Sequence, residues 1–329
     1  MFVVTGGAGF IGSNIVAGLE ERGLGPVAVC DRLGSDEKWR NLAKRELAHL
    51  IAPEGLFDLL AEHRRALTAV IHMGAVSSTL ETDADLAVEA NFRLSCRLFQ
   101  WCAANGVRLI YASSAATYGD GSAGFADDDR PDALARLKPL NLYGWSKHLF
   151  DRWVARRGAD GGALPPQWAG LKFFNVFGPN EYHKGMQKSV VATIYTDAAG
   201  GRACRLFQSH RPDYPDGGQK RDFVWVEDCV AVVLWLLDHP GANGIFNCGT
   251  GQARSFADLA GAVYQALGKE PRIEYVPTPQ PIRDRYQYFT EARMDRLAAV
   301  GFPLETMTSL EDAVTQYVQG YLSAPEPYR

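Results

Sequence analysis

The stretch Phe2-Val3-Val4-Thr5-Gly6-Gly7-Ala8-Gly9-Phe10-Ile11-Gly12-Ser13 joins a short apolar run to a cluster of glycines and then to a helical pattern. It contains two overlapping spacings, G-x-G-x-x-G over residues 7–12 and G-x-x-G-x-x-G over residues 6–12. Glycines at these spacings allow a tight turn, close approach of the backbone to a diphosphate and close packing of a helix on a strand. The helix N-terminus adds free N–H groups and a favourable dipole. The stretch therefore predicts a strand, a diphosphate-binding turn and a helix.

Apolar runs and helical patterns alternate along the first half of the chain. Strands are predicted at residues 2–5, 27–30, 69–72 and 108–112, and helices at residues 11–22 and 86–105. Such an alternation favours a parallel sheet that is covered by helices on both faces. We therefore predict an α/β fold with a Rossmann-type doubly wound parallel sheet.

The second half of the chain has a different pattern. Short strands are expected at residues 171–176, 223–226, 245–247 and 273–276, and a capped helix at residues 255–267. Residues 178–221 are rich in Gly, Pro, His and Asp and are expected to be irregular, with a clear loop at residues 209–218. We predict a Rossmann domain over residues 1–170, with contributions from about 222–250. Residues 171–329 are expected to form mainly a smaller, interleaved substrate-binding lobe.

The composition of this 329-residue chain excludes several classes of protein. Hydrophobic residues make up 47% and charged residues 22%, which argues against disorder, collagen-like structure and coiled coil. A net charge of −4 argues against general nucleic-acid binding. The longest uncharged apolar run, residues 230–237, is too short to span a membrane, and the N-terminus lacks a signal-peptide pattern.

The six cysteines indicate a reducing compartment. They form no C-x-x-C pair, and most lie within apolar runs, so we expect buried thiols in a cytoplasmic protein. The seven histidines do not cluster near them, so we expect no metal site.

The residues that follow the second predicted strand bear on the choice of cofactor. Asp31 lies 19 residues after Gly12, where a carboxylate can bind the ribose 2′-hydroxyl of NAD. Arg32 follows at once and Lys38 is near, and a cation there accommodates the 2′-phosphate of NADP. We expect NADP, with NAD as the alternative.

A tyrosine and a lysine form the candidate catalytic pair. Tyr143 and Lys147 give a Y-x-x-x-K pattern at the start of a helical stretch, so both side chains share one helix face. A nearby ammonium favours the phenolate, which makes Tyr143 a candidate base. Ser114 ends a predicted strand 29 residues before Tyr143, where it can hydrogen-bond the reacting oxygen.

In this order, the glycine loop, Ser114 and the Tyr143/Lys147 pair resemble the extended short-chain dehydrogenase/reductase family, whose members act mostly on nucleotide sugars. The resemblance implies that Asn91 and a small-residue loop also line the cofactor. That loop comprises Met73, Gly74, Ala75, Val76 and Ser77.

Three later segments are similar to the ADP-heptose 6-epimerases of that family: residues 175–185, 220–224 and 285–290. The resemblance implies a redox-neutral epimerisation at carbon 6 of ADP-D-glycero-D-manno-heptose and its L-glycero epimer. Their hydroxyls lie on different sides of the carbon, so two acid/base groups are natural. Tyr143 would serve one epimer and Lys184 the other, assisted by Lys147. The product would enter the inner core of lipopolysaccharide.

The same resemblance implies the remaining site residues. The cofactor would contact Gly6, Gly9, Phe10, Ile11, Gly12, Val176 and Lys184 in addition to the residues above. The substrate would contact Ser114, Asn175, Phe207, Gln208, Ser209, His210, Arg221 and Tyr286, with Arg221 clamping the diphosphate. Relatives of this kind self-associate, so we expect a homo-oligomer with no nucleic-acid or membrane partner.

Some positions depart from the pattern of those enzymes, and other functions stay open. The departures are Pro53, Met186, Thr193 and a longer loop at residues 209–219, which bear on how substrate is held. A UDP-hexose 4-epimerase would need Ser114, Tyr143 and Lys147 but not Lys184. A 4,6-dehydratase would carry acids where Ala115 and Ala116 stand. A non-catalytic NADP-binding protein would have lost Tyr143 or Lys147.

Overall fold

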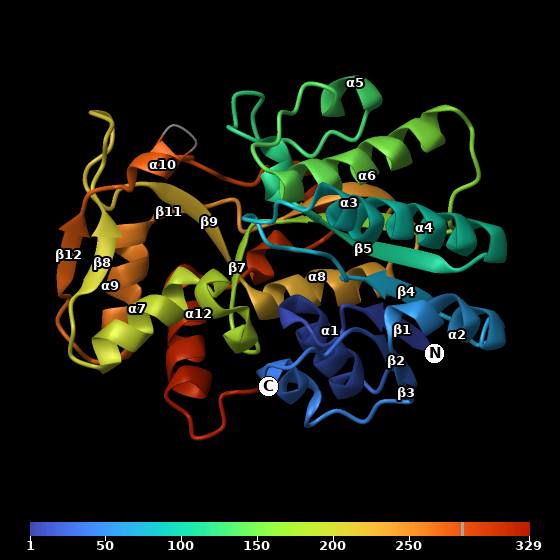
Figure 1. Ribbon diagram of the computed structural model, residues 1–329, viewed down its shortest axis with the longest axis horizontal. Helices are drawn as coiled ribbons and strands as arrows, with labels where there is room; N and C mark the ends of the chain where they lie inside the picture. Colours follow the sequence, from blue (N-terminus) through green and yellow to red (C-terminus); the bar gives the residue numbers. More distant parts are fainter. Residues whose placement is uncertain (284–285) are drawn as a thin grey trace.

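A seven-stranded parallel sheet lies at the centre of the N-terminal part of the molecule in this computed structural model, which describes residues 1–283 and 286–329 (Figure 1). Its strand order is β10-β6-β5-β4-β1-β2-β3, and every pair in it is parallel. The strands are β1 (Phe2–Thr5), β2 (Val27–Cys30), β3 (His49–Ile51), β4 (Ala69–His72), β5 (Arg108–Ser114), β6 (Trp168–Phe173) and β10 (Gly244–Cys248). The order reverses between β1 and β4, which confirms the doubly wound Rossmann-type sheet.

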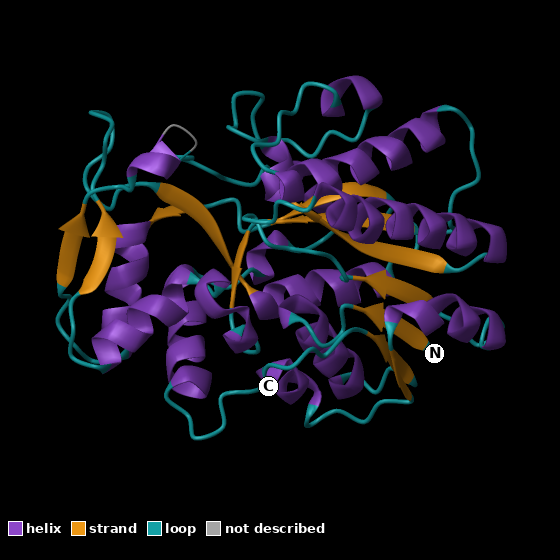
Figure 2. Cartoon of the chain, in the orientation of Figure 1, coloured by secondary structure: helices purple, strands orange, loops and turns teal. Residues whose placement is uncertain are grey.

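Helices cover both faces of this sheet, because apolar side chains alternate along its strands (Figure 2). Val4 and Ile71 pack on one side, where α1 and α8 lie, whereas Val3 and Val70 pack on the other, against α2, α4 and α6. The bounds are α1 (Phe10–Glu21), α2 (Leu56–Glu62), α4 (Leu94–Asn105), α6 (Leu142–Ala159) and α8 (Val226–Asp238).

The second lobe has two small sheets and its own apolar core, and its β8–β12 pair lies at the far end of the molecule in Figure 1. The three-stranded sheet has the order β11-β9-β7, and β8 pairs with β12. The strands are β7 (Asn175–Phe177), β8 (Cys204–Phe207), β9 (Lys220–Trp225), β11 (Ala253–Ser255) and β12 (Ile273–Val276). Three helices, α7 (Val190–Ala199), α9 (Phe256–Ala266) and α12 (Leu310–Tyr317), pack around them.

Shorter helical segments connect these elements. They are η1 (Glu37–Leu42), η2 (Pro53–Gly55), α3 (Ala84–Ala87), η3 (Val88–Arg93), η4 (Ala115–Tyr118), α5 (Pro131–Leu134), η5 (Tyr182–Gln187), α10 (Gln280–Arg283), α11 (Asp295–Ala299), η6 (Leu304–Thr306) and η7 (Val318–Leu322). None of the helices in the described part of the chain is both long and apolar enough to cross a membrane. Of the six cysteines, five are buried and Cys96 is half-buried, and none is paired.

Most of the expected elements are confirmed. The strands predicted at residues 2–5, 27–30, 69–72 and 273–276 match residue for residue. The expected helix at residues 255–267 is α9, and Ser255 and Asp258 form a capping box at its start. The helical stretch expected over residues 86–105 is present but runs through a π-helical segment, η3.

Two expectations were wrong. Residues 171–176 are not one strand, because the chain leaves the large sheet after β6 and enters the small sheet at β7; between them, the Phe174 amide bonds the Cys248 carbonyl at 3.1 Å. Residues 178–221 are not all irregular either, since they contain α7 and β8. Ser189 caps α7, and β8 pairs with a strand about 70 residues further along the chain, a partner that local composition does not reveal. The loop at residues 209–218 is confirmed.

Candidate active site

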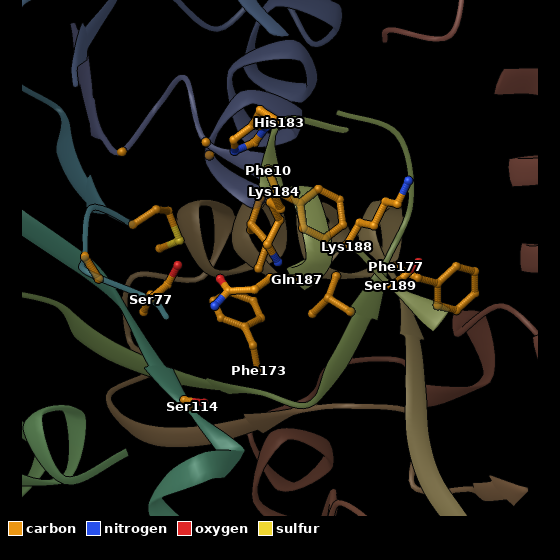
Figure 3. Close-up of a pocket in the computed structure, with 18 of the residues that line it drawn as sticks. Phe10, Ser77, Ser114, Phe173, Phe177, His183, Lys184, Gln187, Lys188 and Ser189 are labelled. Atoms are coloured by element: carbon orange, nitrogen blue, oxygen red, sulfur yellow. The ribbon is translucent and has the colours of Figure 1, made fainter. Parts of the chain in front are cut away.

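A cavity of about 840 Å³ opens beyond the carboxyl ends of the central strands, where doubly wound sheets bind ligands (Figure 3). It is lined from both lobes. The predicted site residues that line it are Gly6, Gly9, Phe10, Ile11, Gly12, Asp31, Arg32, Lys38, Met73, Gly74, Ala75, Ser77, Ser114, Tyr143, Lys147, Asn175, Val176 and Lys184. The structure therefore brings the glycine loop, the Ser114–Tyr143–Lys147 group and Lys184 to one place.

The glycine turn between β1 and α1 fits a diphosphate. Gly6 has a φ of 65°, and a Cβ on Gly12 would lie 2.1 Å from the Gly6 carbonyl oxygen, so neither position tolerates a side chain. Gly9 is the N-cap of α1, and no side chain caps that helix end. The first N–H groups of α1 therefore face the cavity without a competing acceptor side chain, as dinucleotide binding requires.

Asp31 is held by hydrogen bonds at the end of β2. Its Oδ2 accepts from the Ala8 amide at 2.9 Å, and its Oδ1 accepts from Lys38 Nζ at 2.7 Å. Lys38 also donates to the Arg32 carbonyl oxygen at 2.9 Å. The carboxylate thus supports the glycine turn and is neutralised by a lysine that itself lines the cavity.

Arg32 lies at the same end of the cavity but is largely exposed and pairs with Glu54. Glu54 follows Pro53, the position at which this chain departs from the pattern of related enzymes. Since exposed ion pairs are weak, the Arg32 guanidinium can exchange this partner for an anionic ligand.

The candidate catalytic group is assembled where the end of β5 meets the start of α6. Asn141 caps α6 by accepting from the Gly144 amide at 2.8 Å, which starts the helix just before Tyr143. Lys147 is buried and donates from Nζ to the Ala112 carbonyl oxygen at 2.8 Å. Ser114 caps η4 through the Ala116 amide at 3.1 Å, and it lies near enough to Tyr143 to lower the pKa of that phenol.

Burial changes the protonation of this group. It raises the pKa of Tyr143, an effect that the hydrogen bond from Ser114 opposes. It lowers the pKa of Lys147 to about 8, with Asp151 acting in the opposite sense. Burial outweighs the effect of Ser114 in the polypeptide alone, so the expected phenolate, to which a bound, positively charged nicotinamide would contribute, stays a prediction.

Lys184 reaches the same cavity from the second lobe. Figure 3 shows its side chain projecting from η5 on the other side of the pocket from Ser114. Its Nζ lies 5.3 Å from the centre of the Phe10 ring, and burial lowers its pKa whereas Glu181 raises it. The carboxylate of Glu181 is fully buried and accepts from Ser189 Oγ at 2.6 Å and from the Tyr317 hydroxyl at 2.9 Å. Glu181 therefore ties the start of η5 to α7 and α12.

Asn91 and Val76 do not line the cavity. Asn91 is buried in η3, where its amide bonds both the N–H and the carbonyl of Val76 at 2.8 Å and the Ser146 hydroxyl at 2.9 Å. Asn91 thus fixes the loop after β4 and joins it to α6. The implied contact with the cofactor stays a prediction, and in this structure Asn91 supports residues that face the cavity.

Most of the predicted substrate residues are not among those that line this cavity. Arg221 is 8% exposed, and its guanidinium carbon is 5.4 Å from the Tyr286 ring centre and 5.6 Å from that of Phe256, which does line the cavity. Tyr286 packs against Phe207 at 5.9 Å and His210 at 6.5 Å. We call the predicted substrate residues of this region the outer cluster. They are Phe207, Gln208, Ser209, His210, Arg221 and Tyr286. Within the motif at residues 285–290, Arg285 lies outside the described residues.

Sequence reasoning missed other residues that line the cavity. They are Leu33, Gly34, Asp36, Thr79, Phe173, Phe174, Phe177, His183, Gln187, Lys188, Ser189, Val190, Val191, Phe223, Phe256 and Leu259, with Ala112 and Ser113 at the end of β5. His183 precedes Lys184 on η5 and Lys188 directly follows that segment, so the motif around Lys184 could have indicated them. Gln187 donates to Ser78 at 2.7 Å and joins the two sides of the cavity, a contact between distant segments that no local pattern signals.

Comparison with known proteins identifies the family. Residues 2–249 match the profile of the NAD dependent epimerase/dehydratase family. The chain belongs to this family. The glycine turn and the Ser114–Tyr143–Lys147 group therefore lie in a nucleotide-sugar epimerase, as their motifs predicted, and the family implies an NAD(P) cofactor.

Within the epimerase/dehydratase family, several proteins are similar to this one over their full length. It is 50% identical to the ADP-L-glycero-D-manno-heptose-6-epimerase of Nitratidesulfovibrio vulgaris strain DP4 and 43% identical to that of Fusobacterium nucleatum, with 100% of each chain covered. The solved ADP-L-glycero-D-manno-heptose-6-epimerase of Helicobacter pylori superposes with a TM-score of 0.79 at 26% identity, covering 98% of this chain and 96% of that one. The UDP-glucose 4-epimerase of Thermus thermophilus, solved with NAD, gives a TM-score of 0.75 at 27% identity and covers 98% and 99%.

Proposed function

We propose that this protein interconverts ADP-D-glycero-D-manno-heptose and ADP-L-glycero-D-manno-heptose by transient oxidation at carbon 6. One observation carries the proposal: Lys184 enters the cavity from η5, on the other side from Ser114, and Tyr143 lines the same cavity. A 4-epimerase needs only the group on β5 and α6. Identity of 50% over the whole length to an enzyme of this name supports the same choice.

In this proposal, groups on two sides of the cavity transfer the proton, Tyr143 for one epimer and Lys184 for the other. A nicotinamide cofactor, when bound, supplies reversible hydride exchange with carbon 6. Tyr143 takes the proton from the hydroxyl oxygen of one epimer, and Ser114 donates a hydrogen bond to that oxygen. Lys147 contributes a buried ammonium beside the tyrosine, which favours the phenolate.

The second epimer requires a group on the other side of the carbon. Oxidation leaves a ketone at carbon 6 on a short exocyclic arm, and rotation of that arm presents its opposite face. Lys184 then donates a proton to the carbonyl oxygen of this ketone as hydride returns to carbon 6, and it accepts the proton from the hydroxyl in the reverse direction. Burial lowers the pKa of Lys184, which brings the amine closer to the pH at which it can both give and take a proton.

NADP is our proposal for the cofactor. Lys38 and Arg32 stand at the end of β2, and the Asp31 carboxylate is already engaged by Lys38 and by the Ala8 amide. A carboxylate so occupied is less able to bind a ribose 2′-hydroxyl, whereas two cations suit a 2′-phosphate. We expect fluorescence titration to give about tenfold tighter binding of NADP than of NAD, and Lys38→Ala to remove most of that difference. Equal affinities would refute this assignment.

The wider context of the enzyme belongs to the same proposal. We assign residues 1–170, with about 222–250, to the cofactor domain and residues 171–329 mainly to substrate binding. The outer cluster of Arg221, Tyr286 and residues 207–210 would close on the ADP part of the substrate once that part occupies the cavity. We place the enzyme in the cytoplasm as a homo-oligomer that supplies heptose for the inner core of lipopolysaccharide.

The decisive experiment uses the purified protein with ADP-D-glycero-D-manno-heptose and no added cofactor. The two epimers are separated by chromatography while the nicotinamide absorbance is followed. We expect interconversion without net change in that absorbance, because the hydride is returned. No conversion, even with NADP added, combined with conversion of UDP-glucose to UDP-galactose would replace this proposal with a 4-epimerase.

A further inference from the structure

A buried ion pair lies directly behind the candidate catalytic group and has no part in the chemistry above. Lys172 of β6 and Asp151 of α6 are both fully buried, with Nζ 2.7 Å from Oδ2. Lys172 also donates to Thr117 Oγ1 at 2.6 Å. Removing two charges from water is costly, and such a pair is weak evidence for a contribution to stability. Its retention beside an active site therefore calls for another explanation.

Asp151 connects this pair to the strand that carries Ser114. Its carboxylate accepts from Ser113 Oγ at 2.7 Å and from the Tyr111 hydroxyl at 3.2 Å. With Lys172, three donors fix its position, and all three come from β5 and β6. The carboxylate therefore holds α6 against the sheet at the level of the reacting groups.

The contacts between α6 and β5 follow a regular pattern. Tyr143, Lys147 and Asp151 are spaced four residues apart, so they share one face of α6. All three side chains meet the end of β5: Lys147 donates to the Ala112 carbonyl, Asp151 accepts from Ser113 Oγ, and Tyr143 lies beside Ser114. Asp151 is thus the third member of one docking row.

We propose that Asp151 and Lys172 are positioning residues of the epimerisation, which act through Tyr143 and Lys147. Asp151 fixes the docking of α6 on β5. The opposite charges of Asp151 and Lys172 offset each other, which limits the electric field of the pair at Tyr143 and Lys147. This inference rests on the proposed function, because that function assigns proton transfer to Tyr143 and a supporting charge to Lys147.

Electrostatics support the second part of this role. Burial has the largest effect on the pKa of Lys147, which it lowers, and Asp151 has the next largest, which raises it. For Tyr143, burial raises the pKa most, Ser114 lowers it, and Asp151 raises it by a smaller amount. A lone carboxylate there would stabilise the ammonium but oppose the phenolate. Lys172, bonded to that carboxylate, offsets part of its negative charge and so limits its effect on both Lys147 and Tyr143.

Four of the other titratable groups around this row are uncharged near neutral pH, so they do not add to the electric field of the ion pair. From the packed elements, these groups are His72 of β4, Tyr111 of β5, Tyr118 of η4, His148 of α6, Lys184 of η5, Asp127, whose carboxylate accepts from the Asn247 amide, and the ion pair of Asp129 with Arg296. Burial lowers the pKa of His72 to about 3 and that of His148 to about 4, and it raises those of both tyrosines. These four side chains are therefore uncharged near neutral pH.

The test compares Asp151→Asn, Lys172→Met and the double variant, each with its bound cofactor. The titration midpoint of Tyr143 is read by NMR of tyrosine labelled with ¹³C at Cζ, and Tyr143→Phe assigns the signal. Asp151→Asn leaves the Lys172 ammonium unopposed and should lower the midpoint by roughly one pH unit. Lys172→Met leaves the carboxylate unopposed and should raise it by a similar amount, and the double variant should return to the wild-type midpoint.

Kinetics give a second readout and neutral controls. Both limbs of the pH profile of kcat/KM should move down in Asp151→Asn and up in Lys172→Met, whereas KM stays unchanged. Ser113→Ala and Tyr111→Phe remove hydrogen bonds to Asp151 without changing charge, so they should leave the midpoint in place. Thermal melting checks that each variant is folded.

Each outcome decides the proposal. Folded single variants whose midpoints do not move, or move in the same direction, overturn it. If a single variant fails to fold, the double variant still decides, since a wild-type kcat overturns the positioning role and about tenfold lower kcat at an unchanged midpoint supports it. The NMR midpoints need no substrate. A wild-type protein that does not convert ADP-heptose would therefore refute the proposed function while leaving this inference open to test.

Discussion

The two sides of the cavity are built in different ways. On the sheet side, Lys147 stands on α6, an 18-residue helix, and its ammonium is bonded to β5. On the lobe side, Lys184 stands on η5, six residues with a turn at Gly185, where φ is 55°. One amine is fixed by the core of the molecule, whereas the other is held on a short connecting segment.

The lobe side depends on contacts from distant parts of the chain. Glu181 accepts from the Tyr317 hydroxyl, the Tyr182 hydroxyl donates to the Pro327 carbonyl at 2.8 Å, and Gln187 donates to Ser78. The comparison teaches that one of the two proposed proton-transfer groups is part of the scaffold, whereas the other is held on a short connecting segment. A loop-mounted group can follow a substrate whose reacting arm must rotate, which a scaffold-mounted group cannot do.

The largest effect is expected from Tyr143→Phe, which removes the scaffold-mounted base. Epimerisation should fall by about 10²–10⁴-fold because no other group reaches the same oxygen. The glycine turn is untouched, so NADP affinity should stay within about twofold of wild type. Initial rates from chromatography and a fluorescence titration test the two parts separately. A small loss of rate would remove Tyr143 from the mechanism.

Lys184→Met should give the next largest effect, since it removes the loop-mounted group and keeps the length of the side chain. We expect a loss of about 10²–10³-fold in epimerisation. Lys188→Met is the matched control, because Lys188 lines the same cavity four residues further along. Hydride exchange between labelled cofactor and the epimer served by Tyr143 should persist in Lys184→Met. Full epimerisation in this variant would refute the two-base mechanism.

The scaffold side could be predicted from the sequence to a much greater extent than the lobe side. Its signals are local: the spacing of Gly6, Gly9 and Gly12, the alternation of strand and helix, and the four-residue step from Tyr143 to Lys147. Each of these patterns is a direct consequence of helix or turn geometry, so β1, β2, β4 and much of the cavity lining on this side could be predicted, whereas β3 was not predicted and β6 begins at residue 168 rather than 171.

The lobe side depends on pairings that the local sequence does not encode. β8 joins a strand about 70 residues away, and Arg221 meets Tyr286 only after two sheets have formed. The role of Asp151 was missed for the same reason, because a lone aspartate on a helix gives no sign that Lys172 is buried against it. Lys184 was found through a resemblance to related enzymes, and its spacing alone would not have indicated it.

Lys147→Arg sharpens the comparison through pH. Because burial lowers the pKa of Lys147 to about 8, the ammonium is present below that pH and is lost as the pH rises through it. The wild-type kcat/KM should therefore decline above about pH 8. Arginine stays charged, so Lys147→Arg should abolish this decline while lowering the maximal rate by roughly tenfold, because the larger group fits the site poorly. A retained decline would assign it to another group.

The smallest effect is expected from Tyr317→Phe, which acts on Lys184 through its support. The change removes the hydroxyl that donates to buried Glu181, leaving one acceptor less satisfied at a cost of about 1–3 kcal/mol in unfolding free energy. Tyr264→Phe is the matched control, since its buried hydroxyl bonds the Arg272 carbonyl at 2.8 Å in the same lobe but away from η5. Both variants should melt earlier, but only Tyr317→Phe should lower kcat, by a few-fold, because only that tyrosine orders the segment carrying Lys184. Equal kcat in the two variants would show that η5 holds its position without the hydrogen bond from α12. The contrast between the amines of Lys147 and Lys184 would then depend on the short length of η5 alone.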